Sequence, residues 1–271
     1  MSLITISQGM GCGGEAIASY VAGGLNLELY DDVKLKEQAI KMGIRADEVK
    51  TFDEKLPGFF DRIWGRTPDL YLDLMEAVVY EVAKGGKGVI IGHGSNILLR
   101  EFDCALHVFI YASQASRVRH LSEQQGLSPE SAEKLIRKHD TERTGFLKYA
   151  FKMDWNDVSQ YDLTINSEKL GAETAAKLII ETAKSQEIQT CSLTAMDAME
   201  RLMFSKRIEA ALIEKHFTMG YLHIEVPERG VAHLRGFVNS EEEKQSLKEV
   251  VEGISGISEV HSDVAVMPPS A

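Results

Sequence analysis

The sequence has little cysteine and little basic charge, and each shortage argues against a class of protein. Its cysteines, Cys12, Cys104 and Cys191, are odd in number and widely spaced, so they predict neither a disulfide framework nor a zinc-type C-x-x-C pair. The formal net charge is −11, which argues against broad binding to nucleic acid or anionic membranes because those partners attract basic surfaces.

Long hydrophobic runs are also missing. No apolar stretch approaches the roughly 20 residues that a membrane-spanning helix needs. The first residues show no basic segment followed by an apolar core, so no secretory signal is predicted. We therefore expect a cytoplasmic protein with no membrane span. Its 271 residues are enough for one large hydrophobic core or two smaller ones.

A glycine-rich stretch near the N-terminus is the most informative segment that is present. A β-branched run over residues 3–6 leads into glycines at positions 9, 11, 13 and 14, and a helix is expected from Glu15 to Ala22. Strand, glycine loop and helix N-terminus in this order typically bind anions, because backbone amides converge there and the helix dipole favours negative charge. The P-loop pattern G-x-x-x-x-G-K-[ST] requires a lysine after its last glycine. Here Gly14 takes that position, so the loop lacks its usual cation.

The first ~183 residues alternate strand-like and helix-like segments, which predicts an α/β fold with a parallel sheet flanked by helices. Short apolar runs predict three further strands at residues 88–92, 106–111 and 161–165. Helices are expected near residues 69–84, 113–125, 129–149 and 172–184. Strands this short and continuously apolar suit a sheet that is buried on both faces.

The C-terminal part has a different pattern. We predict a first domain at residues 1–184, a polar linker at 185–198 and a second domain at 199–268. The expected elements of this small α+β unit are a helix at 195–217, strands at 221–226 and 231–238, a helix capped by Ser240 and Glu243, and a last strand at 258–266.

Several segments, taken together and in order, resemble the cytidylate kinase-like family, relatives of the P-loop nucleoside monophosphate kinases. The similarity spans about residues 3 to 183 and lies in Ile4-Thr-Ile-Ser7 with the glycine loop, Leu29-Tyr30-Asp31, Val89-Ile-Ile-Gly-His-Gly-Ser95, Ala112-Ser-Gln-Ala-Ser-Arg117, Arg137-Lys-His-Asp140 with Arg143, Asp154-Trp155 and Tyr161-Asp-Leu-Thr-Ile-Asn166. The resemblance implies a P-loop kinase fold. It also implies a transferase that moves the γ-phosphoryl group of ATP, with Mg²⁺, to a nucleoside monophosphate or a related small acceptor.

The same resemblance implies roles for individual residues. Nucleotide phosphate would be bound by the loop and its neighbours: Gly11, Cys12, Gly13, Gly14, Glu15 and Arg117. Arg137 and Arg143, on a mobile lid, would be catalytic because they would stabilise the migrating charge. Asp31 and His93 would face the acceptor. No direct protein ligand for a metal is predicted, although Asp31 or Asp140 could hold magnesium through water.

Departures from the family pattern keep a second function open. Gly14 removes the P-loop lysine, as is usual in the family, but Gln8 and Glu15 also stand where relatives often carry arginine, and His93 replaces an arginine. A mostly neutral imidazole cannot form the bidentate contact that arginine makes with phosphate. We therefore predict weak or altered phosphate binding. The alternative is a non-catalytic nucleotide sensor, or an interaction protein that signals through its C-terminal domain.

Each candidate residue also has a purely structural interpretation. Cys12 is expected to be a small loop filler more than a reactive thiol. Arg137 and Arg143 lie among acidic residues, so ordinary i,i+4 ion pairing competes with ligand binding. Arg117 could be a solvated helix charge, and His93 a hydrogen-bonded structural residue.

The C-terminal unit resembles a BON domain from about Phe204 to Met267. The similarity lies in residues 220–226, 231–238 and 254–260, with Gly236 and Gly256 at the turn positions. The resemblance implies a module that binds a small ligand, a membrane surface or a protein, and a homo-oligomer is also open.

Overall fold

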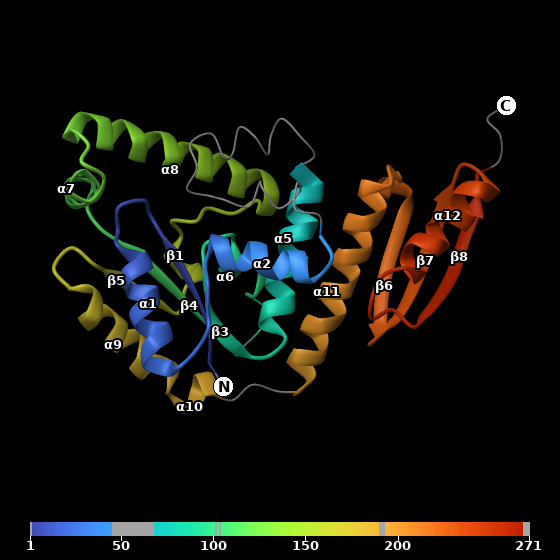
Figure 1. The fold of residues 1–271 in the computed structure, drawn as a ribbon, viewed down its shortest axis with the longest axis horizontal. Coiled ribbons are helices and arrows are strands. Elements are labelled where there is room, and N and C mark those ends of the chain that lie inside the picture. The colour runs from blue at the N-terminus through green and yellow to red at the C-terminus, as the bar shows by residue number, and fades with distance from the viewer. Residues whose placement is uncertain (1, 45–67, 101, 103, 190–192, 268–271) are drawn as a thin grey trace. The chain divides into compact units, whose positions relative to one another are not determined.

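The computed structural model describes residues 2–44, 68–100, 102, 104–189 and 193–267. They form two compact units (Figure 1). The first unit takes its described residues from 1–66 and 85–195, and the second takes them from 67–84 and 196–271. The second unit is therefore assembled from two separate parts of the chain.

The first unit is built on a five-stranded parallel sheet with the strand order β2-β3-β1-β4-β5. The strands are β1 (Ser2–Gln8), β2 (Leu29–Tyr30), β3 (Lys87–Ile91), β4 (Ala105–Tyr111) and β5 (Leu163–Asn166). The central strand β1 pairs with both β3 and β4, so that Ile4 lies opposite Val89 and Leu106. Residues 3–7 of β1 are buried, as expected for a strand that is covered on both faces.

The helices of the first unit are α1 (Gly14–Leu25), α2 (Asp32–Lys41), α6 (Ser95–Leu98), α7 (Gln114–Gln125), α8 (Pro129–Phe151), α9 (Ala172–Ala183) and α10 (Gln186–Gln189), with a 3₁₀ turn at Val158–Gln160. The buried side chains of α1 and α9, such as Ile17 and Ile179, share one core with Ile6 and Ile110 of the sheet. The N-cap of α8 is Ser128, whose hydroxyl accepts a hydrogen bond from the Ser131 amide. The helix then continues unbroken for 23 residues.

The second unit contains a three-stranded sheet with the order β6-β7-β8. Its elements are α5 (Pro68–Ala83), α11 (Leu193–Glu214), a 3₁₀ turn at Met219–Tyr221, β6 (Leu222–Glu228), β7 (Val231–Val238), α12 (Glu241–Glu252) and β8 (Glu259–Val266). β7 pairs antiparallel with β6 and parallel with β8. α12 contacts β7 and β8, and its Leu247 and Val251 are fully buried.

An ion-pair cluster joins α5 to α11 within the second unit. The Lys206 ammonium lies 3.3 Å from an Asp73 oxygen, 3.0 Å from a Glu76 oxygen and 2.8 Å from a Glu209 oxygen. Burial raises the pKa of Asp73 to about 7, although Lys206 opposes the rise. One ammonium thus faces three carboxylates, which favours a proton on Asp73.

The predicted fold class is confirmed: a parallel sheet flanked by helices, followed by a small α+β unit. The strands and long helices expected from the sequence are present, most within three residues of their predicted ends, whereas β2, α2 and α6 were not expected. The predicted linker at 185–198 contains α10 and the first turns of α11, and its residues 190–192 lie outside the described part of the chain.

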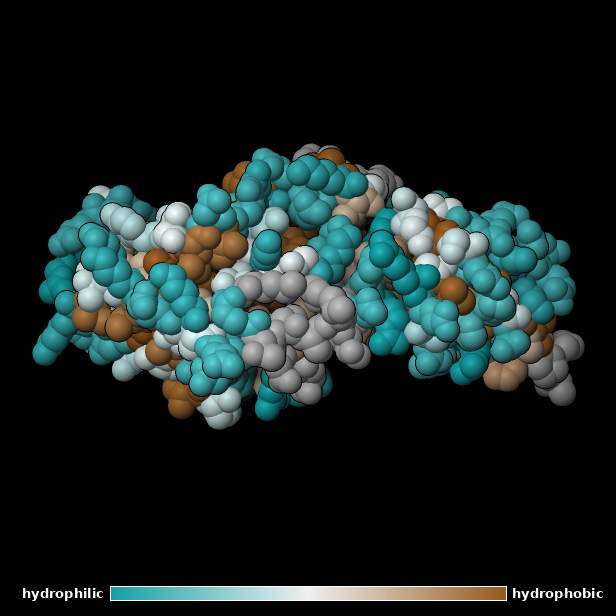
Figure 2. All heavy atoms as spheres, turned by 90° about the horizontal axis from the view of Figure 1, so that it is seen from below, coloured by the Kyte–Doolittle hydropathy of each residue, from teal (hydrophilic) through white to brown (hydrophobic). Residues whose placement is uncertain are grey.

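Hydrophilic side chains predominate on the face of the molecule shown in Figure 2, where hydrophobic residues appear in scattered groups. Among the helices that the structure describes, none is both long enough and apolar enough to span a bilayer.

Candidate functional site

The glycine loop connects β1 to α1 and has a conformation that requires glycine at two positions. Gly11 and Gly13 have φ angles of 82° and 75°, in the left-handed region that disfavours residues with a Cβ. A Cβ at Gly11 would also lie 2.7 Å from the carbonyl oxygen of Arg117, so α7 approaches the loop too closely for any side chain. The Cys12 amide donates to the Gly9 carbonyl at 3.1 Å, which closes the turn before the helix begins.

The side chain of Gln8 is folded back onto the start of α1. Its Oε1 accepts a 2.6 Å hydrogen bond from the backbone amide of Gly14. That amide belongs to the first turn of a helix, where backbone N–H groups have no partner within the helix. A neutral carboxamide oxygen therefore accepts the hydrogen bond of a backbone amide that was expected to bind an anion.

Two arginines hold the backbone of the loop. The Arg117 Nε atom donates to the Met10 carbonyl at 2.7 Å, and Arg143 Nη1 donates to the Gln8 carbonyl at 2.5 Å. Arg117 also forms two 2.8 Å hydrogen bonds with the carboxylate of Asp140. Arg143 is buried, and its guanidinium lies 4.7 Å from the centre of the Trp155 ring.

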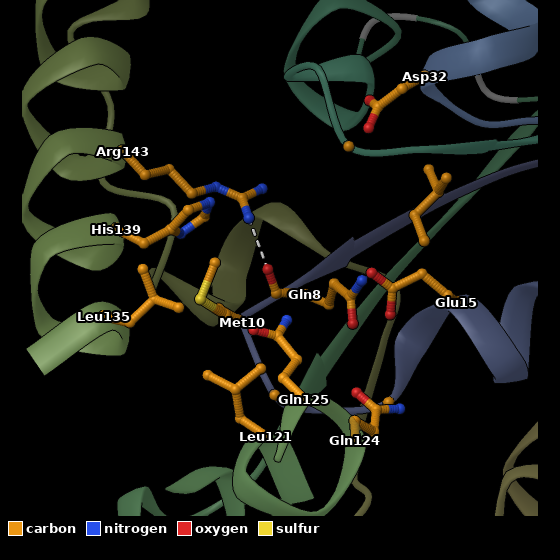
Figure 3. Close-up of a pocket in the computed structure, with 14 residues that line it drawn as sticks. Gln8, Met10, Glu15, Asp32, Leu121, Gln124, Gln125, Leu135, His139 and Arg143 are labelled. Carbon is orange, nitrogen blue, oxygen red and sulfur yellow. Dashed lines mark hydrogen bonds between the residues drawn. The ribbon is translucent and has the colours of Figure 1, made fainter. Parts of the chain in front are cut away.

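A pocket of about 260 Å³, here called the loop pocket, lies beside the glycine loop (Figure 3). Glu15 from α1, Asp32 from α2 and Arg143 from α8 line it. Its other lining residues are Gln8, Met10, Gly11, Gly13, Ile91, Gly92, Leu121, Gln124, Gln125, Leu135 and His139. Within the described part of the chain, Arg143 is the one arginine that lines the loop pocket, and no lysine does.

Asp32 is held by His93. The His93 Nε2 atom lies 2.7 Å from Asp32 Oδ1, and the imidazole is fully buried. His93 has a φ angle of 56° between Gly92 and Gly94, at 77° and 66°, so three successive residues adopt positive φ. An ordinary residue disfavours this conformation, and such strain clusters at functional sites.

A second hollow, also lined by residues of the glycine loop, has an aromatic wall. It measures about 350 Å³ and is lined by Gly9, Cys12, Phe109, Tyr111, Ala112, Arg117, Trp155, Asn156, Val158 and Thr164. Phe109 stacks on Tyr161 at 4.9 Å and meets the edge of Trp155 at 5.8 Å. We call this space the aromatic hollow.

The predicted catalytic and binding residues do not all meet in the loop pocket. Gly11, Gly13, Glu15 and Arg143 line it, whereas Arg137 lines a separate hollow with Arg117 and Asp140. Arg137 is exposed and pairs with Glu133 at 3.2 Å. The two arginines differ because they are six residues apart on one continuous helix, which places them on different faces.

Asp31 has a local structural role, and Cys12 is buried in the hydrophobic core of the first unit. The Asp31 side chain caps α2 by accepting hydrogen bonds from the backbone amides of Val33 and Lys34. Its neighbour Asp32 is the residue that lines the loop pocket. Burial raises the pKa of the Cys12 thiol, although Arg117 nearby acts in the opposite direction. Sequence reasoning missed Asp32, because an aspartate after a helix cap is usual and nothing local marks its pairing with His93.

No group of three or more histidine, cysteine, aspartate or glutamate side chains among the described residues forms a ready metal site. Glu15 and Asp32 are nevertheless oxygen donors on the wall of the loop pocket, and magnesium prefers oxygen ligands and keeps several waters.

Known proteins match both units. Residues 3–169 match the cytidylate kinase-like family, and residues 205–268 match the BON domain. A cytidylate kinase of Pyrobaculum islandicum is 28% identical over 183 residues, which are 67% of this chain and 92% of that protein. A cytidylate kinase of Archaeoglobus fulgidus is 27% identical over 191 residues, 69% of this chain and 97% of that protein. The crystal structure of an uncharacterized protein from Eubacterium ventriosum has a similar fold, with a TM-score of 0.51 at 20% identity over 69% of this chain and 100% of that one.

Proposed function

This chain belongs to the cytidylate kinase-like family, and from that membership we propose that its first unit moves a phosphoryl group from ATP to a nucleoside monophosphate or a related small acceptor. The observation that carries the proposal is the loop pocket, where the glycine loop, the N-terminus of α1 and a buried arginine meet. Phosphoryl transfer needs mainly positioning, backbone donors and positive charge around the phosphates.

Arg143 is the proposed catalytic cation. Trp155 and the Gln8 carbonyl hold its guanidinium at the wall of the loop pocket, so little side-chain freedom remains to be lost when a phosphate arrives. Arg137 is exposed and engaged by Glu133, and we propose a lesser role for it in covering the phosphates. Arg117 acts through the loop, because it fixes the Met10 carbonyl and is itself fixed by Asp140.

Magnesium fits the carboxylates of the loop pocket. With Gly14 at the lysine position of the P-loop pattern, Glu15 stands at the Ser/Thr position whose hydroxyl binds magnesium in that pattern. We propose that Glu15 and Asp32 hold the ion, directly or through water, and that His93 keeps Asp32 in position. The ion would neutralise phosphate charge that these carboxylates otherwise repel.

The two spaces beside the loop suggest how the substrates divide. The aromatic hollow is lined by Tyr111, which is exposed, and by the nearly buried Phe109 and Trp155, and we propose that it takes the base of the donor nucleotide. The loop pocket, with Asp32 and Arg143, would then take the phosphates and the acceptor.

A kinase assay on the full chain tests this function. ATP, Mg²⁺ and each of CMP, dCMP, UMP and AMP are supplied in turn, ADP is followed by a coupled assay, and the phosphorylated product is identified by chromatography. We expect acceptor-dependent ADP formation that Arg143→Ala lowers about 100-fold or more. ADP formation that does not depend on any acceptor contradicts the proposal.

A non-catalytic nucleotide sensor is the second candidate, and one observation favours it. The Gly14 amide already donates its hydrogen bond to the side chain of Gln8, so this donor is not available to a phosphate. A sensor shows thermal stabilisation by nucleotide without turnover.

For the second unit, which matches the BON domain, we propose a binding role, supported by the exposed aromatic residues Tyr221 and Phe237.

A further inference from the structure

Gln8 and Gly14 fit one another in space as well as through their hydrogen bond. A Cβ at Gly14 would lie 2.5 Å from Gln8 Oε1, 2.7 Å from Gln8 Cδ and 3.1 Å from Gln8 Cβ. Three atoms of one side chain therefore fill the space into which any side chain at position 14 would extend. Gly14 is not among the glycines with positive φ, so its backbone admits other residues, and the three atoms nearest to the added Cβ all belong to Gln8.

The P-loop pattern explains what this space is for. When Gly14 is aligned with the lysine of G-x-x-x-x-G-K-[ST], Gln8 falls on the first glycine of the pattern. The pattern thus combines a residue without a side chain at position 8 with a long side chain at position 14. This chain reverses the combination, and the glutamine side chain enters the space from the strand side.

We propose that the Gln8 side chain fills the phosphate-binding position at the Gly14 amide. A nucleotide phosphate must displace this side chain before it can accept a hydrogen bond from that amide. The inference rests on the proposed function and deepens it, because it names Gln8 as the residue that sets the affinity of the loop for di- and triphosphate groups. The bound carboxamide oxygen takes the place of a phosphate oxygen without bringing a charge. It therefore satisfies the amide while Glu15 and Asp32 already make the loop pocket acidic.

The first test needs no ligand, since it measures the coupling between positions 8 and 14. Gly14→Ala alone is expected to lower Tm by about 4 °C or more, because the new methyl group displaces Gln8. In a Gln8→Ala background the same Gly14→Ala change is expected to leave Tm equal or higher, since alanine favours the helix. Equal effects of Gly14→Ala in both backgrounds overturn the proposal.

The second test measures ATP and tripolyphosphate affinity by calorimetry in the full chain. Gln8→Ala is expected to bind both about 5-fold more tightly than the unaltered protein, because one hydrogen bond no longer competes. The double variant Gln8→Gly, Gly14→Lys restores the pattern and is expected to gain about 10-fold or more. Gln245→Ala, an exposed glutamine of the second unit, is the control and leaves affinity unchanged.

The outcomes separate this inference from the proposed function. Weaker binding by Gln8→Ala, with binding by the unaltered protein, shows that Gln8 contacts the ligand and overturns the inference while the function stands. Unchanged affinity of Gln8→Ala also overturns the inference and leaves the proposed function standing. Failure of every variant to bind either polyphosphate overturns both.

Discussion

The guanidinium of Arg117 and the carboxylate of Asp140 form two parallel hydrogen bonds of 2.8 Å, which join α7 to α8 beside the glycine loop. Their side chains are 12% and 27% exposed, so water screens the pair only in part. Arg117 also donates a hydrogen bond to the Met10 carbonyl, so the pair connects α8 to the glycine loop.

Breaking this pair should destabilise the first unit. We expect Asp140→Asn to lower the free energy of unfolding by about 1–3 kcal/mol, and Arg117→Ala by more, because the loop carbonyl also loses its donor. Urea denaturation of both single variants and the double variant measures the coupling energy. Arg119→Ala, on the exposed side of α7, is the matched control and should change stability by less than about 0.5 kcal/mol. A coupling energy near zero contradicts the interpretation.

Arg143 and Arg137 should differ sharply in function. Arg143→Ala is expected to lower kcat/KM about 100-fold or more, since it removes the buried cation of the loop pocket. Arg137→Ala should cost less than about 3-fold, because that side chain is exposed and paired with Glu133. Steady-state ADP formation gives both values, and Tm is measured in parallel to exclude misfolding. Equal losses in the two variants argue against the assignment.

His93 should affect activity and stability through separate contributions. His93→Gly and His93→Ala both release Asp32, and we expect a similar fall in kcat with little change in the KM for ATP. Alanine must also adopt the left-handed backbone at this position, so His93→Ala should be less stable than His93→Gly by about 1 kcal/mol. Kinetics and chemical denaturation measure the two effects. A change confined to stability would make His93 a purely structural residue.

Removal of divalent cations should weaken nucleotide binding strongly. Glu15 and Asp32 line the loop pocket, and without a cation their charges repel the phosphates of ATP. We expect ATP affinity to fall about 10-fold or more in EDTA, and Glu15→Gln to recover part of that loss. Calorimetry with and without Mg²⁺ tests this. An affinity that is independent of Mg²⁺ excludes these carboxylates as its ligands.

The α5–α11 contact should weaken as pH rises. The pKa of Asp73 is raised from 3.8 to about 7 in the folded chain, chiefly by burial. The folded state therefore holds an extra proton between these values, so the stabilisation is complete below about pH 4 and is lost as pH rises through about 7. The shift limits this loss to about 4 kcal/mol, because one pKa unit corresponds to about 1.4 kcal/mol and the opposing effect of Lys206 is already part of the shift. Hydrogen exchange of α5 and α11 amides, corrected for intrinsic rates, measures it. Asp73→Asn should show a smaller dependence, which comes from Glu76 because burial raises the pKa of that carboxyl as well.

The sequence was enough to predict the elements that carry strong local patterns. Continuous apolar runs predicted β3 and β4, and glycine spacing predicted the loop before α1. β2 was missed because it is two residues long. α2 was missed because only Leu35 and Ala39 are buried along its ten residues, which leaves a weak periodic signal.

The site was harder to predict because its contacts join distant residues. Asp32 and His93 are 61 positions apart, and Arg143 and Gln8 are 135 apart. Sequence indicated an anion site at the loop, but it could not show that the Gln8 side chain turns back onto Gly14. That contact depends on the side-chain rotamer of Gln8, which has no sequence pattern.

The helix α5 belongs to the second unit although it lies far from the rest of that unit in the sequence, and this has a practical consequence. A gene cut between residues 184 and 199 would place Asp73 and Glu76 in one polypeptide and Lys206 in the other. Each product would then carry half of a partly buried ionic cluster, whose charges have lost their partners. We therefore expect separately expressed halves to be poorly soluble, and co-expression to restore them by reassociation of α5 with α11.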